Sequence, residues 1–220
     1  MSWEPFILTF KLALITTVIL LVVSIPIAYW LAYTKSKSRF LFETIITLPM
    51  VLPPSVLGFY FLITFGRNTV FGQFLYEHFD IYLPFSFTGL VVGSLIYSLP
   101  FMVNPIQAGF QSLSESLREA SWTLGKSNFV TLMRVLLPSI KPSVYTGIVL
   151  TFAHTVGEFG VVLMIGGNLD STRVASIAIY DSVNKMDYAA AHQYALVLLA
   201  VSFVMLASVY LSNKRSVRYL

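Results

Sequence analysis

Two residues that could do chemistry, His154 and Glu158, lie four positions apart within a long apolar stretch. Residues at this spacing share one face of a helix, so the two side chains could hydrogen-bond to each other. Ionisable groups inside a membrane span are costly and usually functional. The pair lacks the third protein ligand of a catalytic zinc site, which disfavours an intramembrane metalloenzyme. Because a carboxylate repels an anion, we expect Glu158 to serve packing, gating or a contact between subunits.

A second pattern, between Ser116 and Lys126, combines helix-capping signals with apolar residues. Ser116 and Glu119 have the spacing of a capping box, in which the serine accepts from the Glu119 amide and the glutamate reaches back. Gly125 is placed for the left-handed residue that ends a helix. These signals predict a short helix of roughly 12 Å.

The predicted short helix is amphipathic and is followed by another. Apolar residues recur at helical spacing on one face, at Leu113, Leu117, Ala120 and Leu124. Ser127 is then expected to cap a second amphipathic helix, which carries Phe129 and Met133 and ends at Pro138. Taken alone, this pattern is typical of a short surface helix lying near a membrane.

The composition indicates where these residues must sit. Of the 220 residues, 56% are hydrophobic and 11% are charged, whereas soluble domains carry roughly 25% charged residues. A buried subunit of a soluble complex is therefore disfavoured. The absence of cysteine excludes disulfides and thiolate metal sites. The basic residues form short clusters at the ends of apolar segments, so we expect no nucleic-acid partner.

Five apolar segments each reach the roughly 20 residues needed to cross a bilayer. They cover about 6–33, 41–65, 86–111, 143–167 and 189–212. The first is too long for a cleavable signal and should remain as a helix. We therefore expect an all-α polytopic membrane protein, with about five kinked transmembrane helices in one domain over residues 1–220. Residues 168–188 are ambiguous and could form a sixth, interfacial or re-entrant segment.

Positive charge predicts the orientation of the chain. Ten of the fourteen lysines and arginines follow the first, third and fifth segments: Lys35, Lys37, Arg39, Arg118, Lys126, Arg134, Lys141, Lys214, Arg215 and Arg218. Most acidic residues lie on the opposite side. The prediction is that the N-terminus is outside, that the C-terminus is cytoplasmic, and that the loop at about 112–142 is also cytoplasmic.

Prolines interrupt three of the predicted spans, at Pro26, at Pro49, Pro53 and Pro54, and at Pro100 and Pro105. Each proline removes a backbone donor and is expected to kink its helix. Prolines are common in transmembrane helices, but three within six residues favour helices that bend around a cavity. We therefore take Pro53, Pro54 and Asn104, together with His154 and Glu158, as candidates for a pathway or for helix packing.

The loop at 112–142 resembles the EAA loop of ABC importer permeases. Glu119-Ala120-Ser121 is followed after three residues by Gly125, and after nine more by Val135-Leu136-Leu137-Pro138. The family pattern is Glu-Ala-Ala, three residues, Gly, nine residues, then Ile-x-Leu-Pro. Ser121 and Val135 depart from it by small changes that keep the spacing.

The resemblance implies an ABC importer permease fold and a mechanical role for this segment, which we name the coupling loop. In that family a coupling helix docks in a groove of a separate ATP-binding subunit. The residues expected to couple are Ser116, Leu117, Glu119, Ala120, Ser121, Leu124, Gly125 and Lys126. The chain has no Gly-x-x-x-x-Gly-Lys-Ser/Thr loop, so it should bind no cofactor and leave ATP and Mg to its partner.

A second resemblance concerns the substrate. The runs Gly157-Glu158-Phe159-Gly160 and Ile165-Gly166-Gly167-Asn168 are similar to those of molybdate permeases. This likeness implies an inner-membrane importer of molybdate or tungstate, in a bacterium or archaeon. Its partners would be two ATP-binding cassette subunits, a second copy of itself and an extracytoplasmic oxyanion-binding protein.

Two alternatives remain open. A sulfate or thiosulfate permease would carry a similar Gly-Glu-Tyr/Phe-Gly run. An ion-coupled secondary transporter or channel would show internal repeats and charged coupling residues, of which only His154 and Glu158 are present. No span carries paired lysines or arginines, so the sequence gives no high-affinity anion site. A binding protein that selects the oxyanion would make such a site unnecessary.

Overall fold

The computed structural model describes residues 2–216, and these residues form helices without any strand. The all-α prediction is therefore confirmed. The helices are α1 (Glu4–Tyr33), α2 (Arg39–Val51), α3 (Pro54–Phe65), α4 (Val70–Phe79), α5 (Phe87–Gln111), α6 (Glu115–Thr123), α7 (Asn128–Thr131), the π-helical η1 (Leu132–Leu136), α8 (Leu137–Ser139), α9 (Lys141–Gly157), α10 (Gly160–Gly166), α11 (Ala175–Asn184) and α12 (Tyr188–Ser216).

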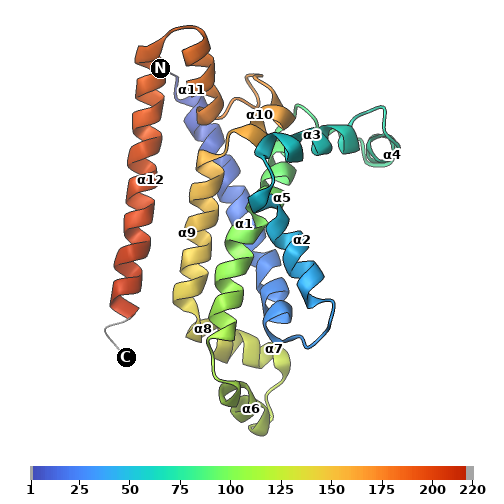
Figure 1. The fold of residues 1–220 in the computed structure, drawn as a ribbon, viewed down its shortest axis with the longest axis vertical. Helices are drawn as coiled ribbons and strands as arrows, with labels where there is room; N and C mark the ends of the chain where they lie inside the picture. The colour runs from blue at the N-terminus through green and yellow to red at the C-terminus, as the bar shows by residue number, and fades with distance from the viewer. Residues whose placement is uncertain (1, 217–220) are drawn as a thin grey trace.

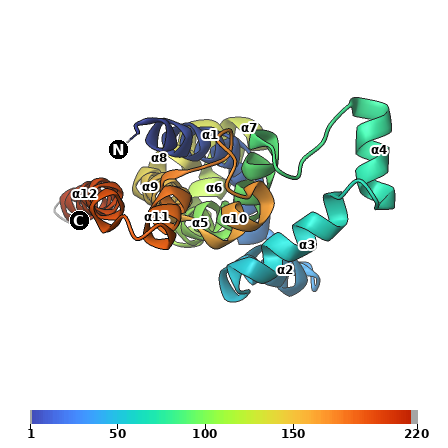
Figure 2. The same cartoon turned by 90° about the horizontal axis from the view of Figure 1, so that it is seen from above.

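The body of the molecule is a bundle of α1, α5 and α9, which lie side by side along its long axis (Figure 1). Met102 and Ile106 on α5 are fully buried and pack in one cluster with Leu31 of α1 and Leu136 of η1. Figure 2 shows α12 at one side of the bundle and the α3–α4 arm projecting from the other. The coupling loop forms one end of the molecule, and α10 and α11 lie toward the opposite end.

Three helices, α1, α5 and α12, are long and apolar enough to cross a membrane. Two bent pairs bring the number to five if each pair is one span: α2 with α3, bent by 110°, and Asn128–Ser139 with α9, bent by 78°. The expected spans at 6–33, 86–111 and 189–212 match α1, α5 and α12. The expected apolar segment at 143–167 is not a single helix in the structure, because α9 ends at Gly157 and α10 is a separate helix.

The prolines affect the helices unequally. α1 remains a single helix through Pro26, and α5 does so through Pro100 and Pro105. The helix is interrupted between α2 and α3, just before Pro54, where Leu52 and Pro53 are both extended. A residue before proline is driven out of the helical region, and two consecutive prolines impose this twice. The expected interruption is therefore confirmed at this pair alone.

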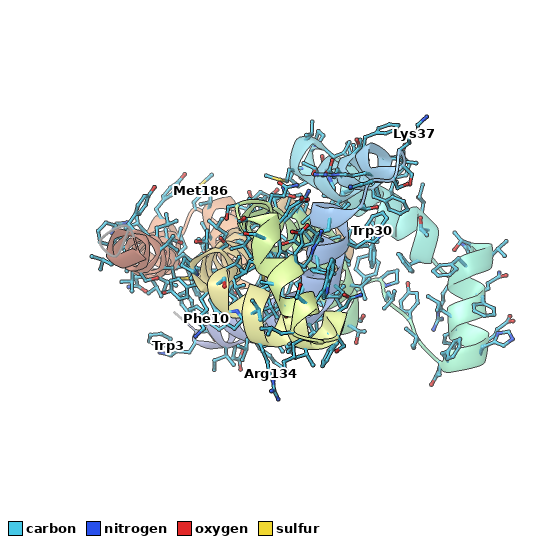
Figure 3. The ribbon with its side chains drawn as sticks, turned by 90° about the horizontal axis from the view of Figure 1, so that it is seen from below. Trp3, Phe10, Trp30, Lys37, Arg134 and Met186 are labelled. Atoms are coloured by element: carbon cyan, nitrogen blue, oxygen red, sulfur yellow. The ribbon has the colours of Figure 1, made fainter. Side chains whose placement is uncertain are left out.

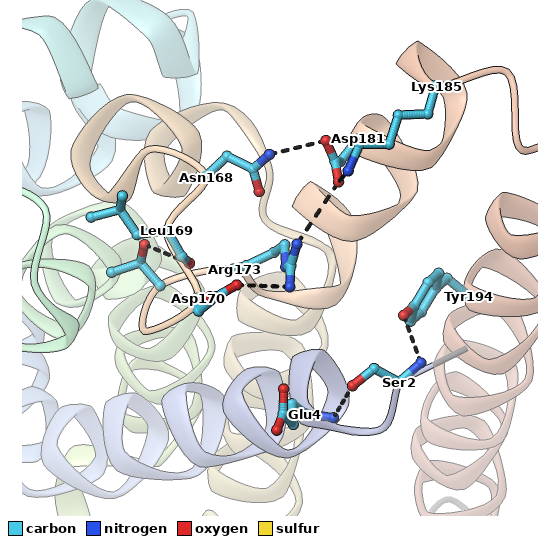
Figure 4. Close-up of polar contacts among 10 residues, drawn as sticks. Ser2, Glu4, Asn168, Leu169, Asp170, Arg173, Asp181, Lys185 and Tyr194 are labelled. Carbon is cyan, nitrogen blue, oxygen red and sulfur yellow. Dashed lines mark hydrogen bonds and ion pairs between the residues drawn. The ribbon is translucent and has the colours of Figure 1, made fainter.

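The ambiguous segment at 168–188 contains α11, which packs against α12 and the start of α1. The Thr9 hydroxyl on α1 accepts from the Ala175 amide at 2.8 Å. Polar contacts hold the preceding loop to α11 (Figure 4): Asn168 donates to Asp181 at 3.1 Å, and the Arg173 guanidinium lies 3.9 Å from the Asp181 carboxylate. The Lys185 ammonium, 2.7 Å from Asp181, holds the pKa of that carboxyl below its usual range.

Several of the basic residues used to predict orientation lie at the end that carries α6. Seen from that end, Lys37 and Arg134 project away from the bundle (Figure 3). Arg218 and the side chains of Lys214 and Arg215 lie outside the described part of the chain. The exposed charges at this end are consistent with a water-facing surface there.

Candidate functional site

The coupling loop begins with a helix that starts earlier than the sequence predicts. Ser114 is extended and caps α6, its hydroxyl accepting from the Ser116 amide at 3.3 Å. The capping box of Ser116 and Glu119 is therefore wrong. Ser116 lies inside the first turn, and its hydroxyl bonds to that of Ser114 at 2.7 Å. Two serines compete for the cap, and use of the earlier one lengthens the helix.

The end of α6 is a left-handed turn at Gly125, as predicted, with φ of 72°. The Gly125 amide donates to the Trp122 carbonyl at 2.8 Å, and the Lys126 amide donates to the Ser121 carbonyl at 3.1 Å. This pair of bonds is the Schellman motif, which satisfies carbonyls at a helix end. The helix is therefore closed at both ends by its own residues.

The second helix follows at once. The Ser127 hydroxyl accepts from the Val130 amide at 3.3 Å and caps α7, which confirms the predicted cap. The helical run continues through η1 and α8 to Ser139, one residue beyond the expected end at Pro138. The buried hydroxyls of Ser121 and Thr131 lie 2.8 Å apart and join the two helices.

The predicted apolar face of α6 is divided between two directions. Leu113 and Leu117 are half-buried and pack against the core of the bundle. Leu124 points outward and is 75% exposed. Of the residues expected to couple, Ser121 is buried and Leu117 half-buried, and the exposed ones are Ser116, Glu119, Ala120, Leu124, Gly125 and Lys126.

Further exposed apolar residues of the coupling loop were not among the predicted coupling residues. Trp122 on α6 is 41% exposed, Phe129 on α7 is 71% exposed, and Met133 on η1 is also exposed. The signal available in the sequence was their apolar character in a loop otherwise rich in polar residues. Together with Leu124 they give this end of the molecule an apolar surface for a partner.

Arg118 anchors the other side of α6 to the bundle. Its guanidinium lies 4.2 Å from the centre of the Tyr33 ring and 4.9 Å from that of Trp122. Tyr33, at the end of α1, donates from its hydroxyl to the Phe110 carbonyl of α5 at 3.1 Å. The cation–π contact with Tyr33 links the short helix to α1, and the Tyr33 hydrogen bond extends that link to α5.

The second candidate region is the break between α9 and α10, where Glu158 is extended and only 4% exposed. The Ser94 hydroxyl of α5 donates to Glu158 Oε2 at 2.8 Å, and the Ser176 hydroxyl of α11 donates to the Glu158 carbonyl at 2.6 Å. Oε1 is buried without a partner among the described residues. The break is thus tied to two neighbouring helices, with one acceptor left unsatisfied.

His154 lies one turn earlier and contacts a different serine. Its Nδ1 is 3.1 Å from the Ser98 hydroxyl, which is 3.0 Å from the Thr155 hydroxyl. Thr155 donates its one hydroxyl proton to a backbone carbonyl. Ser98 must therefore donate to Thr155 and accept from His154 Nδ1, which leaves Nε2 of a neutral imidazole as an acceptor.

The expected hydrogen bond between His154 and Glu158 is replaced by bonds to α5. Ser94 and Ser98 are one turn apart and meet Glu158 and His154 in antiparallel order. The imidazole also stacks on Phe101, with ring centres 3.9 Å apart. Glu158 lies just beyond the end of α9 with extended backbone, so the two residues do not share a helix face, although both side chains meet α5.

A cavity of about 560 Å³ lies where the two broken segments meet. Its lining includes Pro54, Ser55, Tyr97, His154, Glu158 and Gly160. The walls approach closely, because a Cβ added at Gly160 would lie 2.6 Å from the Pro54 Cβ.

The cavity therefore brings together three of the predicted pathway residues, Pro54, His154 and Glu158. Pro53 is the extended residue that precedes α3. Asn104 lies elsewhere on α5, its Nδ2 3.9 Å from the Met50 sulfur of α2. Across residues 2–216, no three His, Asp or Glu side chains group closely enough to hold a metal ion.

Comparison with protein families places these features in a known context. The family described as "Binding-protein-dependent transport system inner membrane component" matches residues 24–218. The fold is also similar to that of a solved bacterial ABC transporter that imports the acidic polysaccharide alginate, with a TM-score of 0.74. That similarity covers 99% of this chain and 80% of the other at 20% identity, and it supports the ABC importer permease fold.

Among curated proteins, the molybdenum transport system permease protein of Azotobacter vinelandii is 46% identical over 94% of this chain and 92% of its own length. The sulfate transport system permease protein of Salmonella typhimurium is 34% identical over 83% of this chain and 66% of its own length. A putative molybdenum transport permease of Bacillus subtilis is 27% identical over 93% of this chain.

Proposed function

Because the chain belongs to the family of inner membrane components of binding-protein-dependent transport systems, we propose that it is the membrane-spanning subunit of an ATP-driven importer of molybdate or tungstate. The observation that supports molybdate as the substrate is the 46% identity to the molybdenum transport permease over nearly the full length of both chains. The sulfate relative is more distant and extends beyond the matched region, which favours molybdate over sulfate.

The proposed role of the coupling loop is to dock on a separate ATPase subunit that binds ATP and Mg. Support comes from the closed, short helix α6 at one extreme of the molecule and from the exposed Leu124. A rigid helix with an apolar tip suits a groove in a partner protein. Two copies of this chain would pair with two ATPase subunits, and ATP-driven closure of those subunits would displace α6.

The proposed pathway passes the cavity between the two broken segments. Helices that break inside a membrane place backbone polar groups where they can face a cavity. In the described part of the cavity wall no lysine or arginine is present, which suits a route that holds the oxyanion weakly and releases it.

The same proposal includes delivery and orientation. A separate extracytoplasmic binding protein would select the oxyanion and present it at the end that carries α10 and α11. A related arrangement is known for the alginate transporter, which was crystallised with a pentasaccharide-bound periplasmic protein. The coupling loop would face the cytoplasm of a bacterium or archaeon, and the start of α1 would lie outside.

The deciding experiment reconstitutes the chain in proteoliposomes with the ATPase and binding protein encoded by neighbouring reading frames. We expect molybdate-loaded binding protein to stimulate ATP hydrolysis and uptake. Glu119→Ala and Gly125→Val should each lower the stimulated activity by at least about tenfold. Gln73→Ala, on the exposed surface of α4, is the matched control and should behave as the unmodified chain.

The outcomes separate the alternatives. Stimulation by sulfate-loaded but not molybdate-loaded binding protein would replace molybdate by sulfate. Uptake that proceeds without ATP would instead indicate an ion-coupled secondary transporter or channel. Full activity in both Glu119→Ala and Gly125→Val would contradict the docking role of α6.

A further inference from the structure

The contact between Ser121 and Thr131 is a buried hydrogen bond between α6 and the helical run 128–139, which pack against each other. The hydroxyl oxygens lie 2.8 Å apart, and the two residues are 5% and 0% exposed. Ser121 is in the last turn of α6, and Thr131 is the last residue of α7. Within the described residues, no other side-chain hydrogen bond connects α6 to the helical run 128–139. The resemblance to the EAA loop has alanine at position 121, so this hydroxyl is a departure of this chain.

The turn at Gly125 connects α6 to α7 through the backbone, but its own hydrogen bonds do not fix the orientation of one helix against the other. The turn at Gly125 has open space around it, because a Cβ added there would meet no atom within 4 Å. Two backbone bonds, from Gly125 and Lys126 back to α6, close the helix but do not fasten it to α7. Leu117 and Arg118 hold one side of α6 to the bundle, and the Ser121–Thr131 bond fixes its other side to the run 128–139.

The helical run beyond Thr131 is connected to α9 by backbone hydrogen bonds that continue across the bend. The Ile140 amide donates to the Leu136 carbonyl at 3.2 Å, and the Ser143 amide donates to the Ile140 carbonyl at 2.9 Å. Backbone hydrogen bonds therefore continue on both sides of the 78° bend. Leu136 and Ile140 are buried in the core formed with α1 and α5. A displacement of Thr131 must consequently move the start of α9.

We propose that Ser121 and Thr131 are a positioning pair, which makes α6 and the run 128–139 one rigid body and so conveys displacement of α6 to α9. This inference rests on the proposed docking of α6 on an ATPase subunit. Each buried hydroxyl has the other as its side-chain partner, so removal of either leaves the remaining one unsatisfied. The pair touches neither substrate nor ATP and acts through the position of α9.

The test measures oxyanion transported per ATP hydrolysed, in the reconstituted complex with the ATPase and molybdate-loaded binding protein. Ser121→Ala and Thr131→Val should each lower this ratio by about three- to tenfold, while the ATPase still binds. The double variant should resemble either single variant, because the two hydroxyls act as a unit. Thr131→Ser keeps the hydroxyl and should restore the ratio. All values are taken per inserted molecule, which separates coupling from a loss of folded protein.

A second test makes the link between the two helices reversible, and it is possible because the natural chain has no cysteine. In the double variant Ser121→Cys and Thr131→Cys, a disulfide would replace the hydrogen bond. We expect the oxidised form to transport with nearly the unmodified ratio, and reduction to lower that ratio in the same sample. Thiol titration before and after oxidation reports how much of the bond has formed.

Several results would overturn the positioning role. An unmodified ratio in Ser121→Ala and Thr131→Val would do so, as would an equal loss in Thr131→Ser or identical ratios in the oxidised and reduced double variant. Failure of the proposed function looks different. In that case the unmodified chain itself would show no stimulation of ATP hydrolysis by loaded binding protein.

Discussion

The coupling loop and the break at Glu158 lie at opposite ends of the helical path through α9, and they differ in how their polar groups are satisfied. In the loop, the hydroxyls of Ser114, Ser121 and Ser127 each have a partner within 10 residues along the chain. At the break, Glu158 depends on Ser94 and Ser176 from other helices, and Oε1 has no partner. The loop also holds one buried nitrogen without a hydrogen-bond partner among the described residues, Arg118 Nε, so the contrast is between its locally satisfied hydroxyls and the Glu158 carboxyl. A locally satisfied hydroxyl has one preferred arrangement, whereas an unsatisfied acceptor gains from rearrangement.

The largest expected effect concerns the packing at the break. Gly160→Val would place its Cβ in contact with Pro54, whose Cβ lies 2.6 Å from that position. Because the neighbour is a rigid proline ring, α3 and α10 must separate, and we expect uptake to fall by at least about tenfold. Radiolabelled molybdate uptake into proteoliposomes measures this.

Gly157 supplies the matched control for that variant. An added Cβ at Gly157 meets no atom within 4 Å, so Gly157→Ala should keep most of the uptake. Equal uptake by Gly160→Val and Gly157→Ala would show that close packing at the break is unnecessary, and the contrast between the two regions would then disappear.

The next effect concerns the hydrogen bond from Ser94 to Glu158. Ser94→Ala leaves a buried carboxyl without its side-chain donor, and we expect a loss of about 1–3 kcal/mol in stability. Ser94→Thr retains the hydroxyl and is the control. The melting temperature of the purified complex in detergent reports the change. A Ser94→Ala variant as stable as the unmodified chain would mean that Glu158 is already satisfied by another group.

A smaller effect separates backbone strain from side-chain loss in the coupling loop. Gly125 has φ of 72° with open space around it. Strain in the left-handed region costs a residue such as Val about 1–2 kcal/mol, while Asn tolerates it. Gly125→Asn should therefore retain more stimulated ATPase activity than Gly125→Val. Equal losses would point to direct contact of Gly125 with the partner rather than to the turn.

The smallest effect lies in the surface network around Asp181. The hydrogen bond from Lys185 lowers the pKa of the Asp181 carboxyl in the folded protein. The stability that this carboxylate contributes is therefore fully present above its pKa in the unfolded chain, and it is lost as the pH falls through its pKa in the folded protein. The stabilisation should be about 0.5 kcal/mol, as for other exposed ion pairs. Melting curves from pH 7 down to about 3 should show it lost only below the usual pKa near 3.8. Asp181→Asn should remove this part of the pH dependence.

The two regions also differ in how far the sequence predicts them. The turn at Gly125 and the cap at Ser127 were predicted because their signals act within four residues of the chain. The cap at the start of α6 was misplaced by two residues, since Ser114 and Ser116 are both chemically suitable. Local signals give the kind of element reliably and its boundary less well.

The cavity could not have been predicted in the same way. Ser94 and Glu158 are 64 residues apart, and Pro54 meets Gly160 from a different helix. Hydropathy treated 143–167 as one segment because His154 and Glu158 are isolated within a largely apolar stretch. Its extended backbone is stabilised by tertiary contacts with α5 and α11, which no local pattern encodes.

The bend at Ile140 divides the path from α6 into two arms of unequal length. At about 1.5 Å per residue, the twelve residues of 128–139 form an arm of roughly 18 Å, and the seventeen of α9 form one of about 26 Å. If the elbow turns as a unit, each rotation of about 5° moves the Gly157 end by roughly 2 Å on that same geometry. Under the proposed coupling, a displacement of the shorter arm would be amplified by about 1.4 at the wall of the cavity. The longer arm would therefore increase the displacement that reaches the cavity and reduce the force that accompanies it.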